Sequence, residues 1–198
     1  MPVLRVSKNG SLLCTVGSDD VWMISAAISG DIWGPELSQL VVTGGPRPHD
    51  GRQTKLLIWH LSHELVAGDR VAFSFEEGSV SSPKGEEYAS GGPDDQPQTD
   101  FFAPWSEAKL ARRESRPTLA APCKWRFSLD GEHILTVAPD AARQNLNFLA
   151  LWSDDSASRL RISLSKSSLR EISNRSGGEK MLLQYVQTGM RFELAVGC

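Results

Sequence analysis

The sequence predicts an all-β, mainly antiparallel fold built from two copies of a small sandwich or partly open barrel, each with five or six strands. Three observations support this prediction. The opening and closing parts of the chain resemble each other, each part begins with a hairpin-turn signal, and each ends with a stretch that alternates apolar and polar residues. A short helix in the connecting segment completes the expected architecture.

The internal repeat has an offset of 121 residues. Residues 4–16 align without a gap with residues 125–137, and residues 68–75 align with residues 189–196. The identical pairs are Arg5/Arg126, Ser7/Ser128, Gly10/Gly131, Thr15/Thr136, Val16/Val137, Gly68/Gly189 and Arg70/Arg191. The repeat indicates a tandem duplication of about 75 residues, with one copy in residues 1–78 and the other in residues 123–198.

Each copy begins with a predicted hairpin. Asn9-Gly10 separates two apolar stretches in the first copy, and Asp130-Gly131 occupies the same place in the second. Asn-Gly and Asp-Gly both tolerate the positive φ angles of a tight two-residue turn. The turn pair therefore predicts the same hairpin twice.

Further strands follow in the same order in both copies. The apolar runs 20–28 and 146–152 read as buried strands, with a short helix as the alternative. The remaining expected strands are residues 37–43 and 159–164, 55–61 and 180–186, and 68–76 and 190–196. In the last pair of strands, Val71, Phe73 and Phe75 are expected to face the core, as are Phe192, Leu194 and Val196.

Residues 79–122 connect the two copies. Residues 79–100 are rich in Ser, Gly, Pro and acidic residues, which predicts a flexible linker. Good helix formers then predict a helix from Ser106 to Glu114, with Ser106 as its N-cap. The aromatic residues just before this helix are expected to pack on one of the sandwiches: Phe101, Phe102 and Trp105.

Composition limits the classes of function. The net charge of −3 argues against a nucleic-acid binder, because phosphates require a basic face. The charge is uneven, since residues 1–78 carry a net −3 and residues 123–198 a net +2. Three scattered cysteines predict free thiols, with Cys14 buried, and the absence of a signal-peptide pattern or a long apolar run predicts a cytoplasmic protein without membrane contact. A monomer and a homodimer fit equally well.

The search for chemistry gives no catalytic residues, no cofactor and no metal site. The sequence has no phosphate-binding glycine loop, no nucleophile elbow and no paired-cysteine motif. His60 and His63 would share a face on a helix and could there bind a metal. On the expected strand they should point to opposite faces, which argues against a shared ion.

The candidate binding residues lie in loops and in the linker. Trp33 lies in a Gly- and Pro-flanked loop and fits either a binding hot spot or a plug at the end of a sandwich. The loop 44–51 offers a second contact surface, although a solvated charged turn explains it as well. The full set is Trp33, Arg47, His49, Asp50, Arg52, His60, His63, Phe101, Phe102 and Trp105.

These features favour a non-catalytic module that binds another protein. One specific form is a small acidic inhibitor or immunity-type bacterial protein that neutralises a toxin or effector by steric blocking. The alternatives are a structural component of a phage or secretion apparatus, and a small-molecule or enzymatic site in the cleft between the copies. The residues kept in both copies are interpreted as residues of folding, so a specific function is expected among those present in one copy only.

Overall fold

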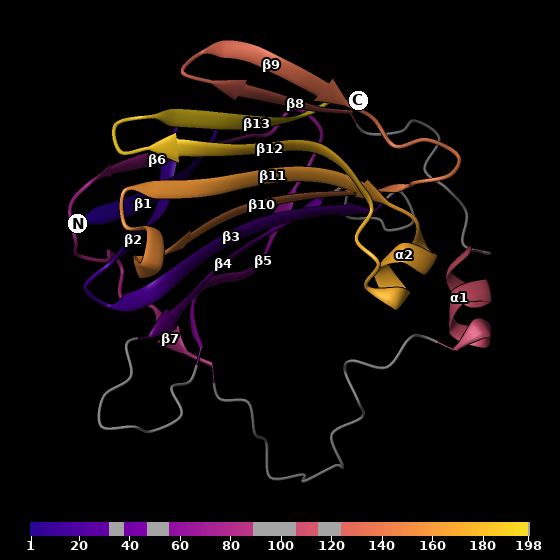
Figure 1. Cartoon of the computed structure of the whole chain (residues 1–198), viewed down its shortest axis with the longest axis horizontal. Coiled ribbons are helices and arrows are strands. Elements are labelled where there is room, and N and C mark those ends of the chain that lie inside the picture. The colour runs from indigo at the N-terminus through magenta and orange to yellow at the C-terminus, as the bar shows by residue number, and fades with distance from the viewer. Residues whose placement is uncertain (32–37, 47–55, 89–105, 115–123, 198) are drawn as a thin grey trace, which may run out of the picture.

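Two antiparallel sheets pack face to face in the computed structural model, which describes residues 1–31, 38–46, 56–88, 106–114 and 124–197 (Figure 1). Each sheet contributes one face to a shared hydrophobic core. The predicted all-β, mainly antiparallel class is thus confirmed.

Sheet A has the strand order β2-β1-β6-β13-β8-β9. Its strands are β1 (Pro2–Lys8), β2 (Ser11–Gly17), β6 (Arg70–Glu77), β8 (Lys124–Leu129), β9 (Glu132–Val137) and β13 (Arg191–Gly197). Sheet B has the order β12-β11-β10-β3-β4-β5-β7. Its strands are β3 (Val21–Asp31), β4 (Ser38–Pro46), β5 (Leu57–Leu65), β7 (Glu86–Glu87), β10 (Asn145–Ser153), β11 (Arg159–Ser167) and β12 (Glu179–Gln187).

The two copies share both sheets, which differs from the expected arrangement of one sandwich for each copy. In sheet A, β6 of the first copy pairs with β13 of the second, and in sheet B β3 pairs with β10. The physical reason is the edge of each half-sheet, whose unpaired N–H and C=O groups are satisfied by pairing with the other copy. The result is one sandwich rather than two.

A local twofold relation connects the copies. Ala72 lies opposite Glu193 at the centre of the β6–β13 pair, and these two residues are equivalent in the repeat. The bulge between Val6 and Ser7 in the first hairpin recurs between Phe127 and Ser128 in the second. Equivalent residues therefore occupy equivalent places on the two sides of this axis.

The predicted hairpin turns are present, with positive φ at both turn residues. The φ angles are 52° and 83° at Asn9 and Gly10, and 48° and 83° at Asp130 and Gly131. In each copy the side-chain oxygen of the first turn residue accepts a hydrogen bond from the backbone N–H of a β6 or β13 arginine, at 2.9 Å in one copy and 2.8 Å in the other. The turn chemistry thus also ties each hairpin to the centre of the sheet.

Residues 79–88 form a segment that we call the strap, because it connects the edges of the two sheets in the first copy. Thr15 and Ser82 form a β-bridge at the edge of sheet A, and β7 pairs with β5 at the edge of sheet B. The indole N–H of Trp59 donates to the carbonyl oxygen of Pro83 at 2.9 Å. The start of the expected flexible linker is therefore bound to the sandwich by backbone hydrogen bonds.

Two α-helices and one 3-10 turn complete the described elements: α1 (Glu107–Glu114), α2 (Leu169–Asn174) and η1 (Asp154–Ser156). The predicted N-cap of α1 is present, since the Ser106 hydroxyl accepts from the N–H of Lys109 at 3.3 Å. The aromatic residues expected to anchor this helix lie outside the described residues. In the described part of the chain, no helix has the length and apolar character needed to cross a bilayer.

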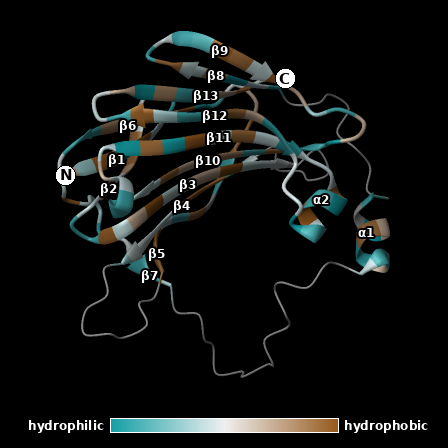
Figure 2. Cartoon of the chain, viewed as in Figure 1, coloured by the Kyte–Doolittle hydropathy of each residue, from teal (hydrophilic) through white to brown (hydrophobic). Residues whose placement is uncertain are grey.

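The core lies between the sheets and joins the copies. The rings of Phe73 and Phe192 stack with centroids 4.9 Å apart, and Phe148 from sheet B contacts both. Along the strands, hydrophobic and hydrophilic residues alternate, as the brown and teal bands of Figure 2 show. The inward positions predicted for β6 and β13 are confirmed, because those side chains are buried. The alternate positions face outward.

Candidate functional site

The outer face of sheet A gathers every identical polar pair of the repeat. Their side chains point away from the core, and all of them except the buried Thr15 are exposed or partly exposed. The set is Arg5/Arg126, Ser7/Ser128, Thr15/Thr136 and Arg70/Arg191. The identical glycines instead make turns with positive φ, and Val16/Val137 lies in the core. The polar pairs thus differ from the other shared residues in lying on the outer side of the sheet.

These residues form two rows that cross the sheet. Their order follows directly from the strand register, and each row contains arginines from both copies. One row is Arg70, Ala195, Arg126 and Thr136. The other is Arg191, Ser74, Arg5 and Thr15. With a spacing of about 4.8 Å between strands, the two arginines of a row stand about 10 Å apart on either side of a small residue.

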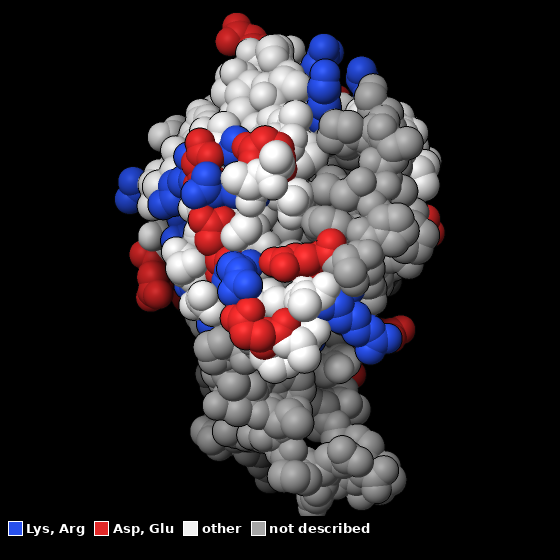
Figure 3. Space-filling model, turned by 90° about the vertical axis from the view of Figure 1, so that its right-hand side faces the viewer, with Lys and Arg blue, Asp and Glu red and all other residues white. Residues whose placement is uncertain are grey.

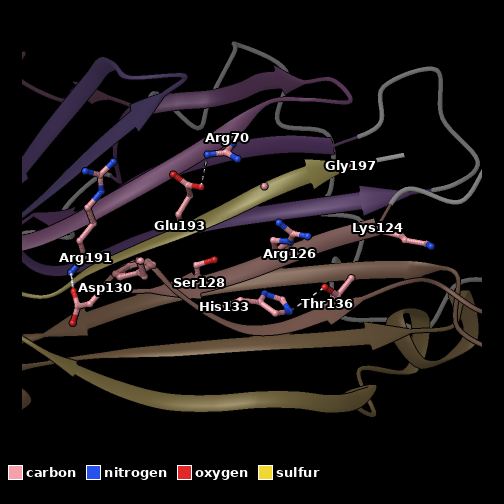
Figure 4. A pocket seen from close by; sticks show the side chains of 13 residues that line it. Arg70, Lys124, Arg126, Ser128, Asp130, His133, Thr136, Arg191, Glu193 and Gly197 are labelled. Carbon is pink, nitrogen blue, oxygen red and sulfur yellow. Dashed lines mark hydrogen bonds and ion pairs between the residues drawn. The ribbon is translucent and has the colours of Figure 1, made fainter.

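A hollow of about 780 Å³ covers the first of these rows and extends along β8 and β13. Figure 4 shows its side chains, with Arg191 and Asp130 at one end, Lys124 and Gly197 at the other, and Arg126 between them. Ala195 and Gly197 lie on β13 at the floor of the hollow, and their small size leaves room above the sheet. A small-residue floor between long basic side chains is the geometry of a shallow binding site.

Basic side chains outnumber carboxylates among the residues that line the hollow. Arg70 forms an ion pair with Glu193 at 3.5 Å, and its side chain remains 63% exposed. Within the described residues, no carboxylate lies at ion-pair distance from Lys124, Arg126 or Arg191. The hollow is thus basic in a protein whose net charge is −3.

Arg5, the residue equivalent to Arg126 in the other row, has a carboxylate partner. Its guanidinium lies 3.4 Å from the carboxylate of Glu76. The repeat places Gly197 where the first copy has Glu76, and Lys124 where it has Val3. The register confirms this equivalence, because Val3 lies opposite Glu76 and Lys124 lies opposite Gly197. The same framework therefore occurs once with a neutralising carboxylate and once without it.

His60 and His63 are the only predicted site residues that the described structure contains. A bulge in β5 places one extra residue between them, since Val42 lies opposite His60 and Leu40 lies opposite His63. Their rings contact each other edge to face, with centroids 5.4 Å apart. The expectation that they point to opposite faces is wrong, because the bulge shifts the alternation by one residue.

The histidine pair lies near a partly buried ion pair. The ammonium of Lys8 lies 2.8 Å from the carboxylate of Asp69, which also accepts hydrogen bonds from Asn9 and the N–H of Val66. Burial and the charge of Lys8 lower the pKa of His63. No group of three or more metal-ligating side chains forms among the residues that the structure describes. This cluster reads as structural support for the β5–β6 turn.

A second concentration of charge lies beside α2 and is internally compensated. Figure 3 shows acidic and basic side chains mixed on this side of the molecule. Arg143 binds Glu171 through two guanidinium nitrogens, at 3.0 and 3.2 Å. Lys166 bonds the carboxylate of Asp140 at 2.6 Å and lowers its pKa to about 2. Because each charge has an opposite partner, this network leaves no free charge for a ligand.

The other predicted binding residues cannot be placed, because they lie outside the described residues: Trp33, Arg47, His49, Asp50, Arg52, Phe101, Phe102 and Trp105. The residues of the hollow were not predicted. A signal for them was present, since the identical polar pairs occupy outward positions of alternating strands. A comparison of the two copies at positions 76 and 197 would also have shown the missing carboxylate.

Comparison of the chain with protein-family models, with curated proteins and with solved structures gives no match. The geometry of the chain itself therefore carries the functional argument.

Proposed function

We propose that this protein is a non-catalytic module that binds another protein through the outer face of sheet A. The observation that carries the proposal is the hollow around Arg126. There Lys124, Arg126 and Arg191 have no carboxylate partner among the described residues and stand over a floor of small residues. Arginine is enriched at protein interfaces because its planar head combines hydrogen bonds with packing. Side chains that serve folding alone would more economically pair with each other, as they do beside α2.

Steric blocking is the specific form of this function that we favour. A rigid sheet face changes shape little on binding, so it can cover a partner's active site without an ordering cost. An immunity-type inhibitor of a toxin or effector would act in this way. The contact surface in this proposal is the basic hollow, and the acidic remainder of the protein serves solubility.

The test is recovery of a partner with matched charge-reversal variants. The tagged protein, its Arg126→Glu variant and its Arg161→Glu variant are incubated with an extract of the source cells, and bound proteins are quantified by mass spectrometry. Arg161 is the matched control, because it is exposed on β11, on the outer face of sheet B. We expect a stoichiometric partner with the wild type and with Arg161→Glu, and about tenfold less with Arg126→Glu.

Circular dichroism and thermal unfolding first establish that both variants are folded. Equal recovery of the partner by the two variants would contradict the assignment of the contact surface. Loss of the partner with Arg161→Glu alone would place the interface on sheet B instead.

A further inference from the structure

We infer that the hollow is an anion site that anchors an acidic segment of the partner protein, with Arg126 as the central residue and Arg70 and Lys124 on either side. This inference rests on the proposed function and adds the chemistry of the ligand. The strand register places Arg70 and Arg126 on either side of Ala195 in one row. Lys124 follows on the same strand as Arg126, two residues away.

The two copies of the repeat differ at the position beside this arginine. In the first copy, Glu76 accepts a hydrogen bond from Arg5 at 3.4 Å and so provides the anion from within the chain. In the second copy, Gly197 replaces that glutamate. The first copy therefore shows where a carboxylate binds beside this arginine. Among the described residues of the second copy, no carboxylate stands at this position beside Arg126, and a carboxylate of the partner can take its place.

The other residues of the hollow indicate the type of anion. The hollow also contains Asp130 and Glu193, and its walls include Ser128 and His133. A uniform polyanion such as a nucleic acid would be repelled by these carboxylates, and it requires a more strongly basic surface. A protein segment with acidic residues among polar ones can complement both signs of charge. The arrangement therefore favours an acidic protein segment.

The test exchanges Gly197 for two residues of equal size. Gly197→Glu introduces the carboxylate of the first copy, and Gly197→Gln introduces the same volume without charge. The backbone accepts either side chain, since a Cβ at this position would approach no atom closer than 3.4 Å. The probe is a fluorescein-labelled eight-residue peptide in which glutamate alternates with serine, whose binding to the full-length protein is measured by fluorescence anisotropy at low and high salt.

We expect Gly197→Glu to weaken binding of the peptide about tenfold, and Gly197→Gln to change it by less than about threefold. Binding of the wild type should weaken as salt increases. Equal losses with the two variants would show that volume rather than charge matters and would overturn the inference. Tighter binding of a single-stranded oligothymidylate of the same length than of the peptide would also overturn it.

The two proposals fail in different ways. If the wild type binds no acidic peptide at any salt concentration, the anion site is refuted. Loss of the cellular partner with Arg126→Glu would in that case still support the outer face of sheet A as the contact surface.

Discussion

The guanidinium of Arg126 is exposed beside two small residues of the adjacent strand. Ala195 lies beside it across the strand pair, and Gly197 follows where a carboxylate stands in the other copy. An exposed guanidinium adds little to folding when it is solvated, because surface ion pairs contribute only about 0–1 kcal/mol. Its value lies in the hydrogen bonds that it can give to a carboxylate from another molecule. The difference between Gly197 and Glu76 thus separates the unpaired Arg126 from the paired Arg5.

His63 allows a prediction for stability as a function of pH. Its pKa lies below the ordinary value of 6.5, because burial and then the charge of Lys8 disfavour the imidazolium. The unfolded chain therefore binds more protons as the pH falls through the region of 6.5, and the folded state loses stability there. We expect His63→Gln, which installs the residue found at the equivalent position 184, to reduce the loss of stability between pH 7.5 and pH 5.5.

Urea unfolding at the two pH values measures this effect. The carboxylates whose pKa is lowered, such as Asp69, titrate below this range and do not interfere. Exchange of Gln184, the equivalent residue of the second copy, for Asn removes no titratable group and serves as the control. An unchanged pH dependence in His63→Gln would contradict the prediction.

At the residue scale, the hairpin turns and the core residues were predictable from the sequence. Positive φ at Gly10 and Gly131, burial of Cys14 and the inward aromatic residues all follow from local chemistry. The bulge in β5 could not be predicted, because it depends on pairing with β4 and shifts the alternation without a Gly or Pro signal. The hollow was missed because the shared polar residues were interpreted as residues of folding.

At the scale of elements, the strap shows how the two copies differ. It covers the side of the sandwich between β2 and β5, and Gly17 lies directly beneath it. The equivalent position in the second copy is Ala138. A side chain at position 17 would collide with the backbone of Ser79, so this position beneath the strap requires glycine. Low apolar content predicted a flexible segment, but backbone hydrogen bonds hold it.

We expect Gly17→Ala to lower stability by about 1–3 kcal/mol and to release the strap, because the added methyl group forces the strap backbone outward. Hydrogen exchange measures the release at the amides of Thr15 and Ser82, which bond each other's carbonyl groups. The reverse exchange Ala138→Gly is the control and should cost no more than about 1 kcal/mol. If the amides of Thr15 and Ser82 exchange hydrogen in Gly17→Ala at the wild-type rate, this account is contradicted.

Most element types were predictable, whereas some short ones were not. The strands of both copies follow from periodicity, and the helix after Ser106 follows from its N-cap. Helix α2 was missed although its capping box was readable, with Ser168 and Glu171 in the required spacing. Strand β7 has only two residues and leaves no periodic signal.

At the scale of the whole molecule, the local twofold axis creates a face that neither copy could form alone. Arg70 comes from the first copy and Arg126 from the second, and they meet in one row only because β6 pairs with β13. The repeat was visible in the sequence, but the pairing of its copies was not, because edge pairing leaves no local pattern. The core likewise depends on the pairing of the two copies, since Phe73 stacks on Phe192 of the other copy.

The most direct test of the central claim is a titration of the isotope-labelled protein with the alternating glutamate–serine peptide, followed by amide chemical shifts. The account predicts that the largest shifts fall on the backbone amides around Lys124, Arg126, Ala195 and Gly197. The equivalent amides around Arg5 and Ser74, where Glu76 pairs with Arg5, should change little. Shifts of equal size in the two rows, or shifts centred on the outer face of sheet B, would contradict the claim.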